Sequence, residues 1–391
     1  MKILLKVLCC LALLATLLTN QLAFAADASD IKAGERFEID SKVLGEKRQI
    51  LVHLPGSYTR GQTRFPVLYL TDGAAHFLHT VGTIDFLGGV GRAPEMIVVG
   101  VNNTDRTRDL TPTKGKEEGM ESAGGADKFI KFFEEELIPT INQRYRSAPY
   151  KVFAGHSLGG LFAIHTYLNR PNVFDAYIAV SPSLWWDDKL ILKRAEVVFA
   201  KQKAQGVLFM SLGDEDKDMQ EPFAGFRTLV EKNAGPDFHF GSQLFPDEDH
   251  GSVVLRSHYH GLRKVFEGWN LPREASFQQA LEHFAKLSKR FKYTITLPEP
   301  LANGMGYFYM GEKKFDQAIE VMTWNTKTYP ASANTYDSLC EVLANAGKLP
   351  AAKAQCEQAV RIGQENKDLA LPEYKKSLER VTEKLNAQSK K

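Results

Sequence analysis

Short apolar runs alternate with longer helical patterns between about residues 48 and 250. Several runs are apolar on consecutive positions, which is typical of strands buried on both faces of a mostly parallel sheet. The expected strands lie in QILVHLP, FPVLYLTDG, MIVVGVNN, YKVFAG, AYIAVSPS, GVLFMSLG and FHFGSQLFP. Between them, residues 126–145 and 158–170 show the one-sided apolar spacing of helices that cover a sheet. The pattern predicts an α/β domain over residues 30–270, with helices on both faces of the sheet.

The pattern changes after Trp269, where no further strand is expected and helical periodicity takes over. The segments FDQAIEV (315–321) and LPAAKAQ (349–355) stand 34 positions apart, with Ala318 matching Ala352 and Lys314 matching Lys348. Helix pairs at this period are typical of tetratricopeptide-like repeats. We therefore expect an all-α, tetratricopeptide-like region over residues 271–391. Such a region could bind a protein partner or associate with itself.

The first residues have the pattern of a secretory signal. Lys2 and Lys6 precede an apolar run, and Ala23-Phe24-Ala25 offers a small-x-small cleavage pattern. We expect a signal peptide over residues 1–25 and a periplasmic or secreted protein; the alternative is a retained membrane anchor. No second apolar segment of spanning length follows.

Composition narrows the classes of partner. Removing Lys2 and Lys6 takes the basic residues from 49 to 47, equal to the 47 acids, so charge favours neither nucleic acid nor membrane binding. The signal contains two of the four cysteines. Cys340 and Cys356 remain, and they could pair in an oxidising compartment or stay as buried thiols. No CxxC pattern suggests a metal site.

A candidate nucleophile stands between the strand YKVFAG and the helix that follows it. Gly155-His156-Ser157-Leu158-Gly159 has the spacing of a nucleophile elbow, in which glycines flank a serine on a sharp strand-to-helix turn. The elbow would hold Ser157 at the carboxyl edge of the sheet, where ligands bind in open α/β folds. The alternative is a tight turn whose serine only caps the helix.

A serine nucleophile needs a base, and in hydrolases of this architecture the base follows the acid in the chain. His250 in FPDEDHGSV lies directly after an apolar run and before another helical stretch. His258 and His260 are rivals, but both fall where that helix should already be running. We therefore predict His250 as the base.

The acid is expected in DEDKD, which follows the run GVLFMSLG. A carboxylate at a strand end can orient the imidazole and stabilise its charged form. Asp216 is the prediction, and spacing leaves Asp214, Glu215 and Asp218 as alternatives.

Backbone N–H groups are expected to stabilise a developing oxyanion. One would come from Leu158, directly after the nucleophile, and another from the loop after FPVLYL, near Gly73 and Ala74. In the same loop Asp72 is expected to form local hydrogen bonds.

Two further pairs of residues are candidates for substrate contact. Trp185 and Trp186 follow the strand AYIAV and could form an aromatic wall, with one ring packed inside and the other reaching the cleft. Arg106 and Arg108 could fork onto an acidic ester, or they could pair locally with Asp105 and Asp109.

With these residues located, the chain resembles the putative-esterase family of α/β hydrolases, which includes enterobactin-type siderophore esterases, feruloyl esterase domains and S-formylglutathione hydrolase. The resemblance rests on FPVLYLTDGAAHF (65–77), IVVGVNNTDRTRDLTPT (97–113), FAGHSLGGLFA (153–163) and FDAYIAVSPSLWWDD (174–188). It implies a triad of serine, acid and histidine that uses no metal or organic cofactor, here Ser157, Asp216 and His250.

The function expected from this resemblance is hydrolysis of siderophore-type or small acyl or aryl esters through an acyl-enzyme. The alternatives are acyl transfer by the same triad, and a non-catalytic interaction protein that acts through its helical region.

Overall fold

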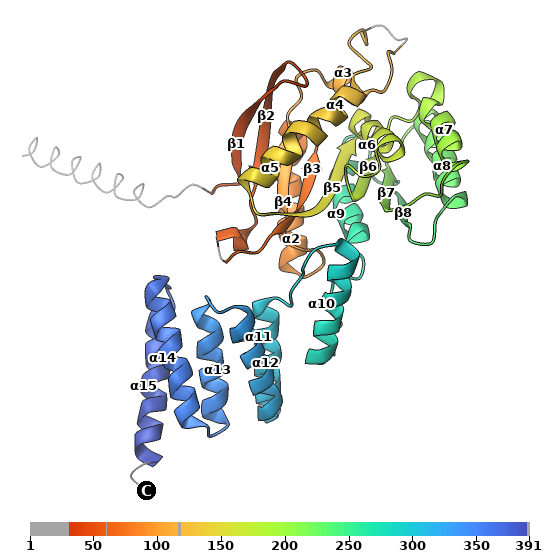
Figure 1. Ribbon diagram of the computed structural model, residues 1–391. Coiled ribbons are helices and arrows are strands. Elements are labelled where there is room, and N and C mark those ends of the chain that lie inside the picture. Colours follow the sequence, from red (N-terminus) through yellow and green to blue (C-terminus); the bar gives the residue numbers. More distant parts are fainter. Residues whose placement is uncertain (1–30, 60, 116–118, 389–391) are drawn as a thin grey trace, which may run out of the picture.

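The computed structural model describes residues 31–59, 61–115 and 119–388 (Figure 1). The expected signal peptide, residues 1–25, lies outside the described residues and stays a prediction. In the described part of the chain no helix has both the length and the apolarity that a membrane crossing requires.

The centre of the fold is an eight-stranded sheet in the order β1-β2-β4-β3-β5-β6-β7-β8. β2 runs antiparallel to β1 and β4, and every pair from β4 to β8 is parallel. The strands are β1 (Glu35–Ser41), β2 (Glu46–His53), β3 (Phe65–Leu70), β4 (Ile97–Val101), β5 (Ser147–His156), β6 (Ala176–Val180), β7 (Val207–Leu212) and β8 (His239–Leu244). The predicted α/β class is therefore confirmed.

Seven strands match the apolar runs, whereas β1 was not predicted. Its sequence ERFEIDS alternates polar and apolar residues, and its side chains are mostly exposed or half-buried. β1 occupies the edge of the sheet, where one neighbour and one partly solvated face leave little apolar signal.

Helices cover both faces of the sheet, because alternate strand residues point to opposite sides. On one face Val67 and Tyr69 of β3 share a buried cluster with Phe133 and Phe162. On the other face Leu68 and Leu70 join a second cluster. The helices of this domain are α2 (Gly73–Gly89), α3 (Arg106–Leu110), α4 (Ala126–Phe132), α5 (Ile138–Arg144), α6 (Leu158–Asn169), α7 (Trp186–Phe199), α8 (Lys217–Lys232) and α9 (Val253–Val265), with two short segments, η1 (Gly56–Thr59) and η2 (Phe133–Leu137).

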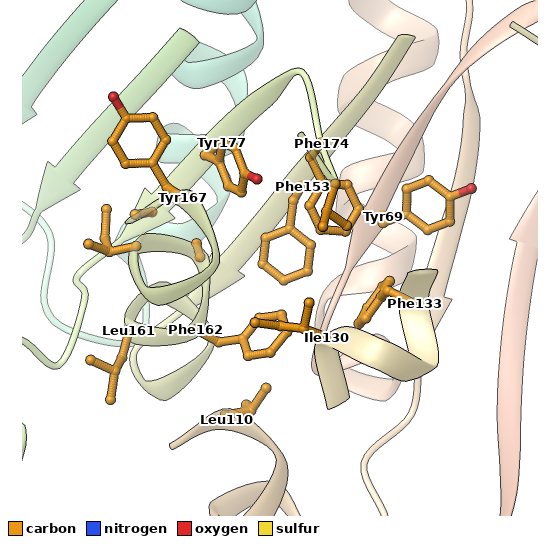
Figure 2. Packing of buried hydrophobic residues seen from close by; sticks show 14 of the residues in the cluster. Tyr69, Leu110, Ile130, Phe133, Phe153, Leu161, Phe162, Tyr167, Phe174 and Tyr177 are labelled. Atoms are coloured by element: carbon orange, nitrogen blue, oxygen red, sulfur yellow. The ribbon is translucent and has the colours of Figure 1, made fainter. Parts of the chain in front are cut away.

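Aromatic rings fill the space between the sheet and the helices α4 and α6 (Figure 2). Phe153 of β5 lies 5.8 Å from Phe133 and 5.4 Å from Phe162 between ring centroids. Burying each such side chain contributes about 1.5–3 kcal/mol. This packing holds α6, and therefore the residue at its start, firmly against the sheet.

Among the described residues, six helices and no strand follow Trp269. They are α10 (Phe277–Phe291), α11 (Glu299–Gly311), α12 (Phe315–Thr328), α13 (Ala333–Asn345), α14 (Leu349–Glu365) and α15 (Leu371–Gln388). α10 begins with a capping box of Ser276 and Gln279. Its Phe291 packs edge-on against Tyr150 of β5, with ring centroids 4.9 Å apart. The first helix of this region thus shares the core of the sheet.

The next four helices keep the spacing that the sequence suggested. α11 and α13 begin at Glu299 and Ala333, and α12 and α14 begin at Phe315 and Leu349, each 34 positions apart. An all-helical region is therefore confirmed, while its assignment to the tetratricopeptide class stays a prediction.

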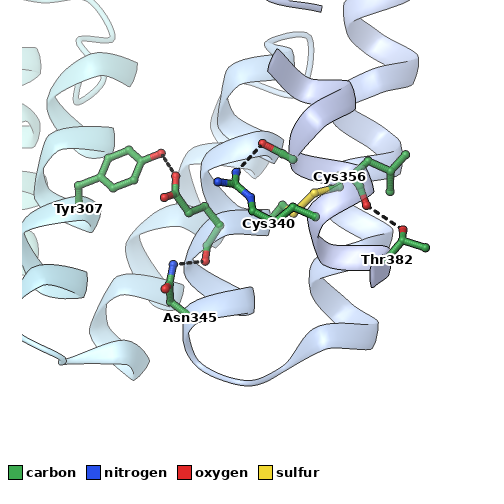
Figure 3. The surroundings of a disulfide bond; sticks show 9 residues. Tyr307, Cys340, Asn345, Cys356 and Thr382 are labelled. Atoms are coloured by element: carbon green, nitrogen blue, oxygen red, sulfur yellow. Dashed lines mark hydrogen bonds between the residues drawn. A yellow bond between two sulfur atoms is a disulfide. The ribbon is translucent and has the colours of Figure 1, made fainter. Parts of the chain in front are cut away.

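A disulfide joins α13 and α14 through Cys340 and Cys356, whose Cα atoms lie 5.3 Å apart (Figure 3). Both cysteines are buried among the apolar residues of the helical region. The sequence left open whether the two cysteines pair or stay as buried thiols, and in the structure they pair.

We predict that the double variant Cys340→Ala/Cys356→Ala loses stability in the helical region. The bond closes a loop of sequence separation 16, and a loop of this size contributes about 3 kcal/mol. Chemical denaturation followed by circular dichroism measures the loss. Two free thiols in denatured, unreduced wild-type protein that lacks residues 1–25 would contradict the assignment.

Candidate functional site

Ser157 occupies the sharp turn between β5 and α6. Its backbone has φ 59° and ψ −115°, a strained conformation for a residue with a side chain. A Cβ at Gly155 would lie 2.2 Å from the carbonyl oxygen of Gly159, so only glycine fits there. A Cβ at Gly159 would lie 2.6 Å from Thr71 Oγ1. Close backbone approach therefore requires glycine at position 155, as the elbow pattern predicted, and the Thr71 side chain crowds a Cβ at position 159.

The turn is anchored to the neighbouring strand. Ser157 N–H donates to the carbonyl of Val180 at the end of β6, at 2.9 Å. In this structure the Ser157 hydroxyl contacts Ser183 Oγ at 3.3 Å rather than the imidazole of His250. Catalytic hydrogen bonds are often long or unformed without substrate, so this geometry leaves Ser157 available as a nucleophile.

His250 follows β8 and contacts a carboxylate that follows β7. His250 Nδ1 lies 2.9 Å from Glu215 Oε2. Ser181 donates its hydroxyl to the other oxygen of the same carboxylate, as does the backbone N–H of Gly213. The Glu215 side chain is only 5% exposed, whereas the His250 ring is 44% exposed. One side of the imidazole is thus fixed by an acid while the ring stays accessible.

The prediction that Asp216 orients His250 is wrong. The Asp216 carboxylate accepts from the backbone N–H of Met219 and caps the start of α8. Glu215, one position earlier and one of the alternatives, makes the contact instead. Both are strand-end carboxylates, and spacing alone could not distinguish a helix cap from a partner of histidine.

Glu215 stays ionised beside His250. Burial raises the pKa of the Glu215 carboxyl, but hydrogen bonds from His250 and Ser181 outweigh it, so the pKa lies below its usual value. A charged Glu215 can hold the imidazole through Nδ1 and stabilise its protonated form.

His156, directly before Ser157, supports the loop that carries His250. Its Nε2 lies 2.7 Å from the backbone carbonyl of His250, and the two ring centroids are 4.6 Å apart. Because a carbonyl accepts, His156 donates through Nε2. Burial and the nearby His250 and His76 lower the pKa of His156 to about 4. The sequence analysis assigned His156 no role.

Further imidazoles pack beside His156. His76 Nδ1 lies 3.1 Å from His79 Nε2, and His79 stacks on His258. His258 is fully buried and bonds to Thr80 Oγ1 at 2.9 Å, so it packs inside the fold rather than serving as the base. His260, the other rival, packs at a tilt against Phe245 and edge-on against Tyr259. Among the described residues, no group of three or more His, Cys, Asp or Glu side chains is arranged to hold a metal ion.

Two helix N-termini meet beside Ser157. Leu158 begins α6, and Gly73 begins α2, directly after β3. The first N–H groups of a helix have no intrahelical acceptor, so those of Leu158, Gly73 and Ala74 are available to an anion. A Cβ placed on Gly159 would touch Thr71 and Asp72, which shows how closely the two turns approach. The arrangement fits the predicted oxyanion hole, whose role stays a prediction.

Only one of the two tryptophans is open to a ligand. Trp186 is 1% exposed and donates Nε1–H to Thr113 Oγ1 at 3.1 Å. Its burial contradicts the prediction that Trp186 contacts substrate. Trp185 is half-buried, so the expected division assigns the inner position to Trp186.

Both candidate arginines are held by carboxylates. Arg108 donates to Glu46 on β2 and to Asp109, and these bonds raise the pKa of its guanidinium. Arg106 donates Nε to Asp72 at 2.7 Å. Arg108 thus shows the local pairing that the sequence left open as the alternative, and the fork of Arg106 is on Asp72. The partner of Arg106 was not among the acids that the sequence analysis weighed.

Comparison with known proteins identifies relatives. A family model described as "Putative esterase" matches residues 41–243. The siderophore triacetylfusarinine C esterase of Aspergillus fumigatus is 31% identical over 253 residues, covering 54% of this chain and 84% of that protein. A siderophore enterobactin esterase of Emericella nidulans is 31% identical over 234 residues, covering 48% of this chain and 77% of that protein.

A solved structure shares both the fold and part of the helical region. An IroE-like serine hydrolase from Shewanella oneidensis superposes with a TM-score of 0.69 at 27% identity. The match covers 75% of this chain and 99% of that one, so it extends beyond the span of the family model.

We predict that Glu215→Gln lowers kcat by about 10³–10⁴-fold, because the neutral amide cannot stabilise the imidazolium and favours the wrong tautomer. Steady-state hydrolysis of a p-nitrophenyl ester measures the effect. Asp216→Asn is the matched control, and asparagine still caps a helix, so its kcat should stay within threefold of wild type. The opposite ranking would restore Asp216 as the acid.

A second prediction concerns acid stability. Burial, with the adjacent His76, lowers the pKa of His79 from its ordinary 6.5 to about 4. Between pH 6.5 and 4 His79 binds a proton in the unfolded chain but not in the folded protein. Its contribution to stability is therefore complete above about pH 6.5 and is lost as the pH drops toward 4. Carboxyl groups whose pKa is lowered in the folded protein, such as Glu215, reduce stability only below their ordinary pKa of 4.5.

We therefore expect the free energy of unfolding of His79→Gln to fall less steeply between pH 6.5 and 4.5 than that of the wild type. The slope should correspond to the uptake of up to one proton fewer on unfolding. Urea denaturation at a series of pH values measures the slope. An unchanged slope in this window would show that His79 titrates normally in the folded protein.

Proposed function

The chain belongs to the putative esterase family, and from this membership we propose that it hydrolyses siderophore-type esters through Ser157, His250 and Glu215. That it is an ester-hydrolysing enzyme follows from the family and its relatives. The observation that carries the catalytic assignment is the 2.9 Å contact between His250 and Glu215 in loops beside the strained turn of Ser157.

In the proposed reaction Ser157 Oγ attacks the ester carbonyl while His250 takes its proton. For this step the Ser157 hydroxyl leaves its contact with Ser183 and hydrogen-bonds to His250 Nε2. Glu215 keeps Nδ1–H of His250 directed toward itself and stabilises the imidazolium. Leu158 N–H, with Gly73 or Ala74 N–H, stabilises the oxyanion of the tetrahedral intermediate.

The imidazolium then protonates the leaving alkoxide, and the acyl group remains on Ser157. A water molecule, deprotonated by His250, attacks this acyl-enzyme. Collapse of the second intermediate releases the acid and restores the serine. The reaction consumes one water per ester bond.

The proposed substrate class is a siderophore ester, since the relatives named above act on triacetylfusarinine C and enterobactin. Trp185 is half-buried in the loop between β6 and α7, and it offers a flat apolar surface to an acyl or aryl group. A periplasmic or secreted location is supported by the signal-like first residues and by the disulfide in α13 and α14.

We expect wild-type protein to hydrolyse a catecholate trilactone, and Ser157→Ala to lose about 10⁴–10⁶-fold in kcat. Chromatography of the released acid measures turnover. Ser183→Ala is the matched control, because its hydroxyl lies 3.3 Å from Ser157 Oγ yet is not the proposed nucleophile. It should lose less than tenfold.

A fluorophosphonate probe provides an independent readout, since it labels an activated serine covalently. Peptide mapping should find the label on Ser157 in the wild type and in Ser183→Ala. Absence of both labelling and turnover would refute the proposed function.

A further inference from the structure

Arg106 joins the two turns that carry the proposed oxyanion hole. It begins α3, in the loop after β4. Its Nε donates to Asp72 Oδ1 at 2.7 Å, and its Nη2 reaches Asp72 Oδ2 at 3.2 Å. The same Nη2 lies 3.1 Å from the carbonyl oxygen of His156, the residue directly before Ser157. One guanidinium thus contacts the loop after β3 and the elbow after β5.

Asp72 is a buried carboxylate at a sensitive position. Its side chain is 8% exposed, and its backbone is left-handed with φ 56°. It directly precedes Gly73 and Ala74. An ideal Cβ on Gly159 would lie 3.4 Å from Asp72 Oδ2, so the carboxylate also borders the first turn of α6. The negative charge therefore lies next to the N–H groups that would receive the oxyanion.

Asp72 has a second donor, which comes from the same loop as Arg106. Asn103 Nδ2 bonds to Asp72 Oδ1. The amide contributes a hydrogen bond without charge, so within the described residues the only salt bridge to Asp72 is that of Arg106. The charge balance beside the proposed oxyanion hole consequently depends on one arginine.

We propose that Arg106 is a positioning residue that neutralises Asp72 and fixes the spacing between the two halves of the oxyanion hole. This inference rests on the proposed function. An unpaired carboxylate beside these N–H groups would repel the negative charge that develops on the substrate oxygen. The low dielectric of a buried site strengthens that repulsion. Arg106 cancels the charge while its third bond holds the elbow.

The proposal differs from a role in binding an acidic substrate. A guanidinium matches a carboxylate through its planar fork, and here that fork is occupied by Asp72. Loss of Arg106 should therefore lower kcat for every ester, neutral or anionic. Loss of a substrate anchor would instead raise KM for anionic esters alone.

The test compares Arg106→Gln, Arg106→Lys and the double variant Asp72→Asn/Arg106→Gln on neutral p-nitrophenyl butyrate and on an anionic p-nitrophenyl ester. We expect Arg106→Gln to lose about 100-fold in kcat with KM within twofold, as for a misplaced catalytic geometry. Removing the uncompensated charge in the double variant should recover about tenfold. Arg106→Lys, which keeps a charge without the fork, should fall between wild type and Arg106→Gln.

Arg361→Gln in α14 is the control for loss of an arginine far from the sheet, since among the described residues Arg361 bonds only to Gln358 and Glu365 on its own helix. Thermal unfolding of each variant establishes that it is folded. If Arg106→Gln does not fold, Arg106→Lys and the double variant are compared with the wild type instead, because the proposal requires both to have a lower kcat with KM within twofold.

Three results would overturn the proposal: full kcat in Arg106→Gln, a loss confined to KM for an anionic ester, or a double variant slower than Arg106→Gln. Fluorophosphonate labelling separates this failure from failure of the proposed function. Labelled and active wild-type protein with an equally active Arg106→Gln refutes only the role of Arg106. Unlabelled, inactive wild-type protein refutes the esterase mechanism itself.

Discussion

The structure depends on one constraint, the turn that places Ser157 at φ 59° between β5 and α6. A residue with a side chain in this conformation costs about 1–3 kcal/mol, so the surroundings must hold it. They do so through close backbone contact at Gly155, the bond from Ser157 N–H to Val180, and the burial of almost all of α6. Because the aromatic core of β5 and α6 secures both ends of the turn, the strain is stored where the serine is presented.

Around this turn, the loops at the carboxyl ends of successive strands are joined by side chains. Arg106, after β4, bonds to Asp72 after β3 and to the backbone after β5. His156, at the end of β5, bonds to the backbone of His250 after β8, and His250 bonds to Glu215 after β7. Parallel strands bring these loops to one edge, and the side-chain bonds fix their mutual spacing. The site is thus a property of the sheet edge as a whole.

Much of this could be predicted from sequence, for physical reasons that differ by element. Buried parallel strands leave consecutive apolar runs, and the elbow leaves a glycine pattern, so both were predicted. The polar edge strand β1 carries neither signal. Glu215 and Asp216 are adjacent carboxylates. Only the direction of each side chain shows that Asp216 caps α8 while Glu215 contacts His250. His156 and Arg106 bond to backbone carbonyls of other loops, and no local spacing encodes such contacts.

The two buried carboxylates show how the site manages charge. Glu215 and Asp72 come from different strand ends, and each is matched by one basic side chain, His250 or Arg106. The two pairs differ in what they can do. The partner of Glu215 is a histidine, which gains and loses a proton during the proposed reaction, so that carboxylate must stabilise a charge that appears only transiently. The partner of Asp72 is an arginine, which stays charged throughout. A permanent pair suits a fixed scaffold beside the oxyanion, and a titrating pair suits proton transfer.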